Sequence, residues 1–187
     1  MANSNDILNN AKSKMKKAQD VLERELSSIR AGRANASILN RVKVNYYGAE
    51  VPVNQVASIS IPEPRVIMVS PYDESSLSDI EKGIYEADLG LNPASDGSVI
   101  RLVIPQLTEE RRQELAKQVK AVGEESKVAV RNVRREAMDA VKKGSKDDDF
   151  TEDEVHRLED QVQKITDDAI KGVDTIVSDK EKEITNN

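Results

Sequence analysis

Basic residues gather between positions 120 and 142 in a pattern suited to binding phosphate. Arg131, Arg134 and Arg135 lie within five residues of one another, and helical spacing of 100° per residue places them on one side together with Lys127. Arginine binds phosphate with two parallel N–H groups, whereas lysine acts as a point charge. The full basic side comprises Lys120, Lys127, Arg131, Arg134, Arg135 and Lys142. Such a helix edge would contact the RNA backbone and recognise shape rather than base sequence.

A plainer interpretation of this basic side is a solvated helix face, because any soluble helix carries lysines and arginines opposite its apolar stripe. Two further details favour binding. Of the nearest acids, Glu124, Glu125 and Glu136, only Glu124 is oriented to neutralise the basic side. More basic residues then lie near two segment boundaries, namely Arg30, Arg33, Arg111 and Arg112.

Residues for other kinds of chemistry are missing from the sequence. There is no cysteine and only one histidine, His156, so zinc sites and Cys–His or Ser–His catalysis lack their parts. No glycine-rich loop with a following Lys-Ser/Thr is present to hold a nucleotide. Asp147–Asp149 lacks the glycine and the final glutamate of a calcium loop. We therefore expect no enzyme, no cofactor and no metal, and we interpret His156 as a surface residue.

Charge is segregated along the chain, although the net charge is −6. Residues 107–146 contain eleven basic and seven acidic residues, whereas residues 147–187 contain five basic and fourteen acidic ones. Because salt limits surface charge to a reach of about 8–10 Å, this local balance matters more than the total. The basic side can therefore bind a polyanion in spite of the acidic composition.

Three stretches have helical periodicity. Residues 4–30 repeat apolar residues every three or four positions, residues 107–146 contain no proline, and residues 151–187 carry the most regular heptad stripe. Thr108 begins the second helix, and Thr151 with Glu154 forms a capping box for the third. The expected apolar seam of the second helix is Leu115, Val119, Val122, Ala129, Val133, Ala137 and Ala140. Residues 144–150 are expected to be a linker.

The segment between the first two helices has the residue pattern of strands instead of helical periodicity. Alternating or β-branched runs predict strands at residues 42–47, 51–53, 56–61, 66–70 and 99–104. Residues 77–87 predict a short amphipathic helix, and residues 90–97 a turn. About seventy residues are enough for a small α+β domain.

The order of these elements predicts an α+β protein with two domains. An antiparallel three-helix bundle, discontinuous in sequence, would comprise residues 1–30 and 107–187, with a small β/α/β domain inserted at residues 31–106. Two chain segments, 30–33 and 104–107, would join the domains as a two-stranded hinge in an L-shaped or dumbbell-like molecule. The hinge residues are Ala31, Gly32, Ile104, Pro105 and Gln106.

Several motifs together make the chain resemble the bacterial ribosome recycling factor family. They lie in the expected order over nearly the whole sequence: Ile29–Ala34, Tyr46–Gly48, Asp88–Pro93, Leu107–Arg112 and Val128–Arg135. The stretch from Asp147 to Gln161 is the least typical, so His156 acquires no role from the resemblance.

The resemblance implies a translation factor. Family members, with elongation factor G and GTP, dissociate the post-termination ribosome into subunits, and their bundle binds large-subunit rRNA across the A and P sites. The RNA-contacting arginines would be Arg131 and Arg134, with Arg30, Arg33 and Arg112 in support near the hinge. Together with the basic side, this gives Arg131, Arg134, Arg135, Lys127, Arg112, Arg30 and Arg33 as the candidate RNA-binding residues.

One alternative function is a helical adaptor that oligomerises through its heptad seams. Three seams in one chain instead favour internal packing, so we expect a monomer. No apolar run approaches the ~18 residues of a membrane span, and residues 1–6 lack a signal-peptide core. We therefore expect a cytoplasmic protein. The resemblance implies that its partners are the ribosome and elongation factor G.

Overall fold

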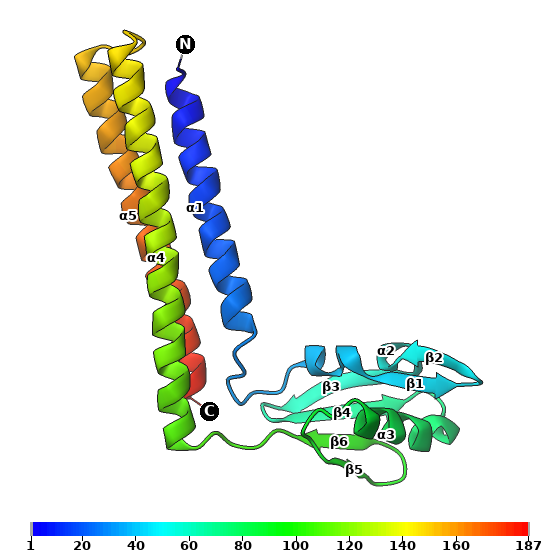
Figure 1. The fold of residues 1–187 in the computed structure, drawn as a ribbon. Helices are drawn as coiled ribbons and strands as arrows, with labels where there is room; N and C mark the ends of the chain where they lie inside the picture. The colour runs from blue at the N-terminus through cyan, green and yellow to red at the C-terminus, as the bar shows by residue number, and fades with distance from the viewer. Residues whose placement is uncertain (1, 187) are drawn as a thin grey trace. The chain divides into compact units, whose positions relative to one another are not determined.

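The computed structural model of the protein describes residues 2–186, which form two compact units (Figure 1). The helical unit comprises residues 2–31 and 108–186, and the sheet unit comprises residues 32–107. The predicted α+β class is confirmed, because one unit consists of long helices and the other contains a small antiparallel sheet.

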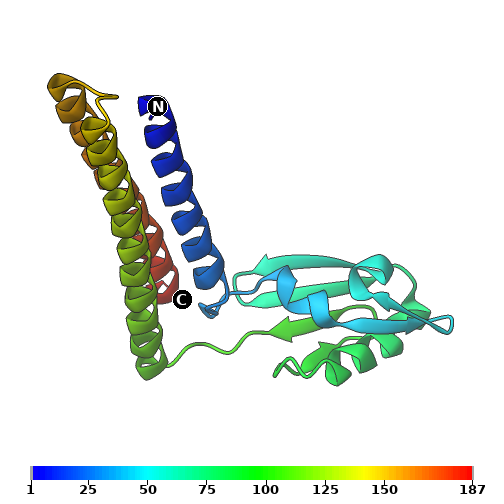
Figure 2. The same ribbon diagram turned by 45° about the horizontal axis from the view of Figure 1, so that its top comes forward.

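Three long helices build the helical unit, namely α1 (Ser4–Ser27), α4 (Glu109–Lys146) and α5 (Glu152–Thr185). They pack side by side, and α4 runs antiparallel to α1 and α5 (Figures 1 and 2). With 38 residues, α4 is about 57 Å long at ~1.5 Å per residue. The unit is thus a three-helix bundle, as predicted.

Side-chain caps set the starts of the long helices. The Thr108 hydroxyl accepts a hydrogen bond from the Arg111 amide at 3.1 Å and so caps α4. Thr151 and Glu154 form the predicted capping box of α5, with each side chain accepting a bond from the other's amide. These caps satisfy amides that have no partner in the first turn of a helix.

Two helix ends differ from the prediction. Helix α1 ends at Ser27 instead of residue 30, where the hydroxyls of Ser27 and Ser28 donate back to carbonyls of the last turn at 2.7 and 2.6 Å. Helix α4 continues into the predicted linker of residues 144–150 and ends at Lys146. Gly144 is buried there because the Phe150 ring occupies the space that a Cβ would need.

The buried side of α4 is also rotated from the expected seam. Ala129 is exposed, so this assignment was wrong, and Val122, Val133 and Ala140 are only half-buried. Val130 and Val141, which were not assigned to the seam, are fully buried. The buried positions are Leu115, Val119, Gly123, Ser126, Val130, Ala137, Val141 and Gly144. Small residues occupy the closest approaches: a Cβ on Gly123 would lie 2.6 Å from the Val177 side chain. An apolar count overlooks Gly123 and Ser126 and therefore misplaces the seam.

The sheet unit contains a four-stranded antiparallel sheet in the order β3-β4-β6-β5 and a separate β1-β2 hairpin. The strands are β1 (Lys43–Tyr46), β2 (Ala49–Pro52), β3 (Ala57–Glu63), β4 (Val66–Pro71), β5 (Pro93–Ser95) and β6 (Ile100–Val103). The helices are η1 (Ala36–Arg41), α2 (Val53–Val56), η2 (Glu74–Ser76) and α3 (Leu77–Glu86). Strand β5 lies in the predicted turn region, and η1, α2 and η2 were not predicted because single turns have no measurable periodicity.

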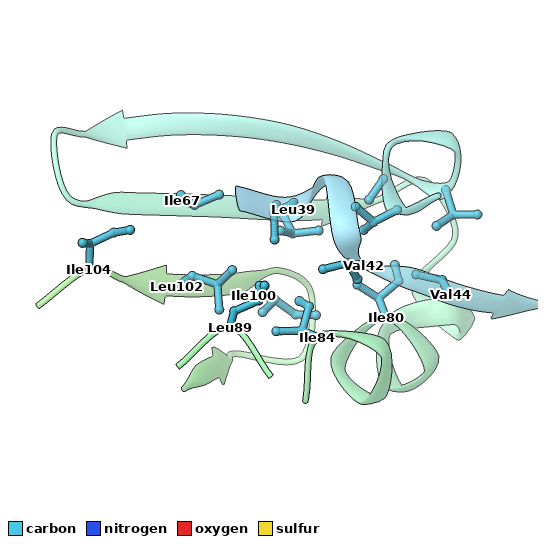
Figure 3. Packing of buried hydrophobic residues seen from close by; sticks show 14 residues of the cluster. Leu39, Val42, Val44, Ile67, Ile80, Ile84, Leu89, Ile100, Leu102 and Ile104 are labelled. Atoms are coloured by element: carbon cyan, nitrogen blue, oxygen red, sulfur yellow. The ribbon is translucent and has the colours of Figure 1, made fainter. Parts of the chain in front are cut away.

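Large aliphatic side chains form the core of the sheet unit (Figure 3). Leu39, Ile67, Ile80, Ile84, Ile100 and Leu102 are all at most 1% exposed. Helix α3 lies close to strand β1, because a Cβ on Gly83 would meet the Lys43 carbonyl. The sheet unit therefore has a continuous core of its own.

The chain enters and leaves the sheet unit at one place, beside the turn between β3 and β4. The Ala34 amide donates to the Pro64 carbonyl at 2.7 Å, and the Ile104 amide donates to the Arg65 carbonyl at 2.8 Å. Because Pro64 and Arg65 are consecutive, the two connecting segments are fixed to neighbouring points of this turn.

Candidate nucleic-acid interface

Four of the five candidate RNA-binding residues of α4 lie together on about two turns of the helix. Arg131 and Arg135 are exposed, whereas Lys127 and Arg134 are half-buried. Both half-buried side chains reach across to α5. The four residues therefore form a surface that we call the basic edge, in which two side chains are anchored and two extend into solvent.

Lys127 is anchored by carboxylates. Its Nζ lies 2.7 Å from Asp174 of α5 and 3.5 Å from Glu124 of α4, and only 20% of the side chain is exposed. The hydrogen bond with Asp174 is the main cause that raises the pKa of Lys127, with a contribution from the charge of Glu124. Lys127 stays protonated, but its charge is largely offset by these two acids.

Arg134 is anchored by a neutral group. Its Nε donates to the Gln163 side-chain oxygen at 2.8 Å, and the Gln163 amide nitrogen donates to Asp167 at 2.9 Å. The remaining N–H groups of Arg134 are on its two terminal nitrogens, which can donate two parallel hydrogen bonds to a phosphate. Arg134 thus keeps its charge while its side chain is held.

Acids near the basic edge are directed away from its exposed arginines. Glu136 pairs with Lys14 of α1 at 2.8 Å, and Glu124 pairs with Lys127. The orientations inferred for Glu124 and Glu136 therefore agree with the structure. Arg131 and Arg135 remain the exposed cations of the edge.

The other predicted RNA-binding residues do not join the basic edge. Arg112 is on the first turn of α4, nineteen residues from Arg131, which is about 28 Å along the helix. Its Nε is buried without a hydrogen-bond partner within the described residues. Arg30 and Arg33 are exposed and lie after the end of α1, in the helical unit and the sheet unit respectively.

The predicted hinge residues fall into two groups. Pro105 and Gln106 are exposed, and Gly32 has a φ of +76°, a left-handed conformation that favours glycine. Ile104, by contrast, is 9% exposed and is part of the sheet unit's core, where its amide bonds to Arg65. In the second connecting segment, residues 104–107, Ile104 thus packs into the sheet unit, and the exposed residues begin at Pro105.

Three polar residues of α5 were missed by the sequence analysis: Gln163, Asp167 and Asp174. Each contacts the basic edge directly or through one neighbour. No local pattern marks them, because their role depends on the register of α5 against α4.

Few other features of the described residues suggest a chemical site. No group of three or more His, Cys, Asp or Glu side chains in residues 2–186 is placed to hold a metal, and His156 is exposed. Two clefts of about 720 and 540 Å³ flank the first turns of α1. No helix in the described part of the chain is long and apolar enough to cross a membrane.

Comparison with known proteins gives a consistent family assignment. The family model for ribosome recycling factor matches residues 22–185. The ribosome-recycling factor of Pediococcus pentosaceus is 64% identical over 180 residues, covering 96% of this chain and 97% of that protein. The one from Lactiplantibacillus plantarum is 65% identical over 184 residues, with 98% of each covered.

Solved structures agree with this assignment. A solution structure of the ribosome recycling factor is 38% identical, with a TM-score of 0.72 and full coverage of both chains. A second, described as the T. thermophilus ribosome recycling factor and the E. coli elongation factor G bound to the E. coli post-termination complex, is 44% identical with a TM-score of 0.62, covering 98% of this chain and 99% of that one. On sequence and fold together, the chain belongs to the ribosome recycling factor family.

Proposed function

We propose that this protein dissociates the post-termination ribosome into subunits together with elongation factor G and GTP. In this proposal the bundle binds large-subunit rRNA across the A and P sites through the basic edge of α4. Family membership supports the reaction. The observation that carries the binding surface is the arrangement of Arg131, Arg134 and Arg135, a cluster of forked cations on a helix held rigidly by two others.

Phosphate contact explains why a helix edge can serve as the binding surface. Guanidinium groups on successive turns are about 5.4 Å apart along the helix, so more than one of them can contact the same stretch of nucleic-acid backbone. Such contacts fix position without reading bases. A factor that acts on every ribosome, whatever the message, needs recognition of this kind.

The energy for subunit separation would come from the partner. The sequence has no nucleotide-binding loop, so GTP hydrolysis belongs to elongation factor G in this proposal. A long bundle bound to the large subunit can then transmit a push as a rigid body, because the interlocked helices resist bending.

A hinge between the two units is the second part of the proposal. The two connecting segments leave the sheet unit from neighbouring points, at Pro64 and Arg65, and two adjacent connections allow rotation about a common axis. Gly32→Pro removes the left-handed backbone at one connection. We expect ribosome binding to change less than twofold while the splitting rate falls several-fold, as measured by stopped-flow light scattering. An unchanged splitting rate would argue against hinge motion.

The adaptor alternative has less support. The seams of α1, α4 and α5 are buried against one another within a single chain, which leaves no continuous apolar stripe for oligomerisation on the helices of residues 2–186. We propose a monomer in the cytoplasm. Sedimentation velocity over a hundredfold range of concentration distinguishes the two, since an adaptor would show a concentration-dependent dimer.

The direct test of the proposed function is a subunit-splitting assay. Post-termination ribosomes are mixed with the protein, elongation factor G and GTP, and dissociation is followed by light scattering. We expect a loss of scattering that requires all three components. If the intact protein causes no dissociation at any salt concentration, the proposed function is wrong.

A further inference from the structure

We propose that Gln163 of α5 is a positioning residue for RNA binding, because it holds the guanidinium of Arg134 in the orientation that receives a phosphate. This inference rests on the proposed function and deepens it. It makes the RNA-binding surface a composite of α4 and α5, in which α5 orders a cation without touching the RNA.

The first argument is the geometry at Arg134. The Nε of Arg134 donates to the Gln163 oxygen at 2.8 Å, across the α4–α5 interface, and the bond is partly buried. Within residues 2–186 this is the one hydrogen bond recorded for the Arg134 side chain. Fixing Nε fixes the plane of the whole guanidinium, since the group is rigid and planar. The two terminal nitrogens, with four N–H donors, stay available for a phosphate.

The second argument is the orientation of the Gln163 amide. Its nitrogen donates to Asp167, one turn further along α5, at 2.9 Å. A carboxylate only accepts hydrogen bonds, so it selects the amide orientation in which the oxygen points to Arg134. Asp167 therefore keeps the Gln163 oxygen, which accepts hydrogen bonds, directed at Arg134, and keeps the Gln163 nitrogen, which donates them, directed away.

The third argument is the contrast with Lys127, the neighbouring cation on the same edge. Lys127 is anchored to α5 by the carboxylate of Asp174 at 2.7 Å. An ionic anchor orders the side chain but offsets its charge, which lowers its attraction for phosphate. Gln163 is uncharged, so Arg134 is ordered and keeps its full charge. The neutral anchor is what suits Arg134, and not Lys127, to bind RNA.

A competing interpretation is that Gln163 stabilises the bundle independently of Arg134, for example through its hydrogen bond to Asp167. The two differ in what Gln163 does once Arg134 has gone. A positioning residue acts through Arg134, so its removal then has no further effect on RNA binding. A purely structural residue would weaken binding equally whether Arg134 is present or absent.

The experiment is a double-mutant cycle of Arg134→Ala and Gln163→Ala in the full-length protein. The measured quantity is the Kd of fluorescently labelled protein for isolated large ribosomal subunits at one fixed salt concentration. We expect Gln163→Ala to weaken binding about 3- to 10-fold, because the Arg134 side chain would then have to be immobilised when it binds. In the Arg134→Ala background the same change should alter the Kd less than about 1.5-fold.

Control variants separate positioning from folding. Gln161→Ala changes an exposed glutamine on the same helix and should leave the Kd unchanged. Gln163→Met keeps the length and packing of the side chain without an acceptor, and it should weaken binding as Gln163→Ala does even if the alanine variant loosens the bundle. Gln163→Glu introduces an ionic anchor like that of Lys127, and it also places a second carboxylate beside Asp167, so binding should weaken.

The outcomes distinguish this inference from the function on which it rests. If Arg134→Ala leaves the Kd unchanged, the proposed RNA-binding site itself is wrong. If Arg134→Ala weakens binding but Gln163→Ala and Gln163→Met do not, the site stands and the inference is overturned. Equal effects of Gln163→Ala in both backgrounds, or tighter binding by Gln163→Glu, would also overturn it.

Discussion

The two units of this protein differ in how closely their elements pack. The sheet unit encloses large aliphatic side chains such as Ile80, Ile100 and Leu102. The helical unit also buries large side chains such as Met15 and Leu22. The buried side of α4 in addition includes Gly123, where the Val177 side chain of α5 approaches closely, and Gly144, which the Phe150 ring covers. Lost volume should therefore destabilise either unit, and added volume should also destabilise the bundle along α4.

This difference has a functional consequence. Close packing along three long helices keeps the exposed surface of α4 straight and rigid, so residues such as Arg131 are held at fixed intervals. The sheet unit, with its own core, can move without losing its fold. A rigid binding surface and an independently stable second unit are what a hinged factor requires.

Removing volume from the sheet unit should produce the largest effect. Ile100→Ala deletes a fully buried side chain of β6 and should lower the free energy of unfolding of this unit by about 2–5 kcal/mol. Val103→Ala on the same strand is the matched control, because Val103 is 58% exposed. Urea unfolding followed by hydrogen exchange resolves the two units. A similar loss in both variants would contradict the core described here.

Adding volume to the bundle should produce a smaller effect. Gly123→Ala places a methyl group about 2.6 Å from the Val177 side chain. Overpacking of this kind lowers the free energy of unfolding by about 1–3 kcal/mol. The higher helix propensity of alanine offsets up to ~1 kcal/mol of this loss. We expect a lower melting temperature for the bundle. Val177→Ala in the same chain should reverse much of the loss, and a failure to do so would place the strain elsewhere.

Acid should affect one turn of the sheet unit. Bonds from the amides of Val99 and Ser98 lower the pKa of Asp96 from 3.8 to about 2. Because the folded-state pKa is depressed, the stabilising contribution is present above pH 3.8 and disappears as the pH falls through 2. Asp96→Asn should therefore flatten the pH dependence of sheet-unit stability between these values, as measured by thermal melts. An unchanged pH profile would show that Asp96 does not contribute.

Local patterns were sufficient to predict much of the fold. Caps such as Thr108 and the Thr151–Glu154 box act within one turn, so their sequence signature is complete. Helix periodicity located all three long helices because each extends over many turns. The short elements of the sheet unit, including β5, depend on tertiary packing and leave no comparable signal.

Contacts between helices were not predictable in the same way. The seam of α4 was misassigned because Gly123 and Ser126 are buried by close approach, and an apolar pattern ignores them. The basic residues were found from their types and spacing. Their anchors, Gln163 and Asp174, were missed because only the register of α5 brings them to Arg134 and Lys127.

The central claim is that phosphate contacts by the basic edge bind the protein to the large subunit. It is tested most directly by the salt dependence of binding for the wild-type protein and for Arg131→Ala/Arg134→Ala. Each lost phosphate contact reduces the slope of log Kd against log salt by about 0.7–0.9. We predict a slope smaller by about 1.5, a weaker Kd and a protein that stays folded with a slightly lower melting temperature. Arg131 is exposed, and removal of Arg134 costs the bundle one partly buried hydrogen bond to Gln163. The same slope and the same Kd in both proteins would contradict the account.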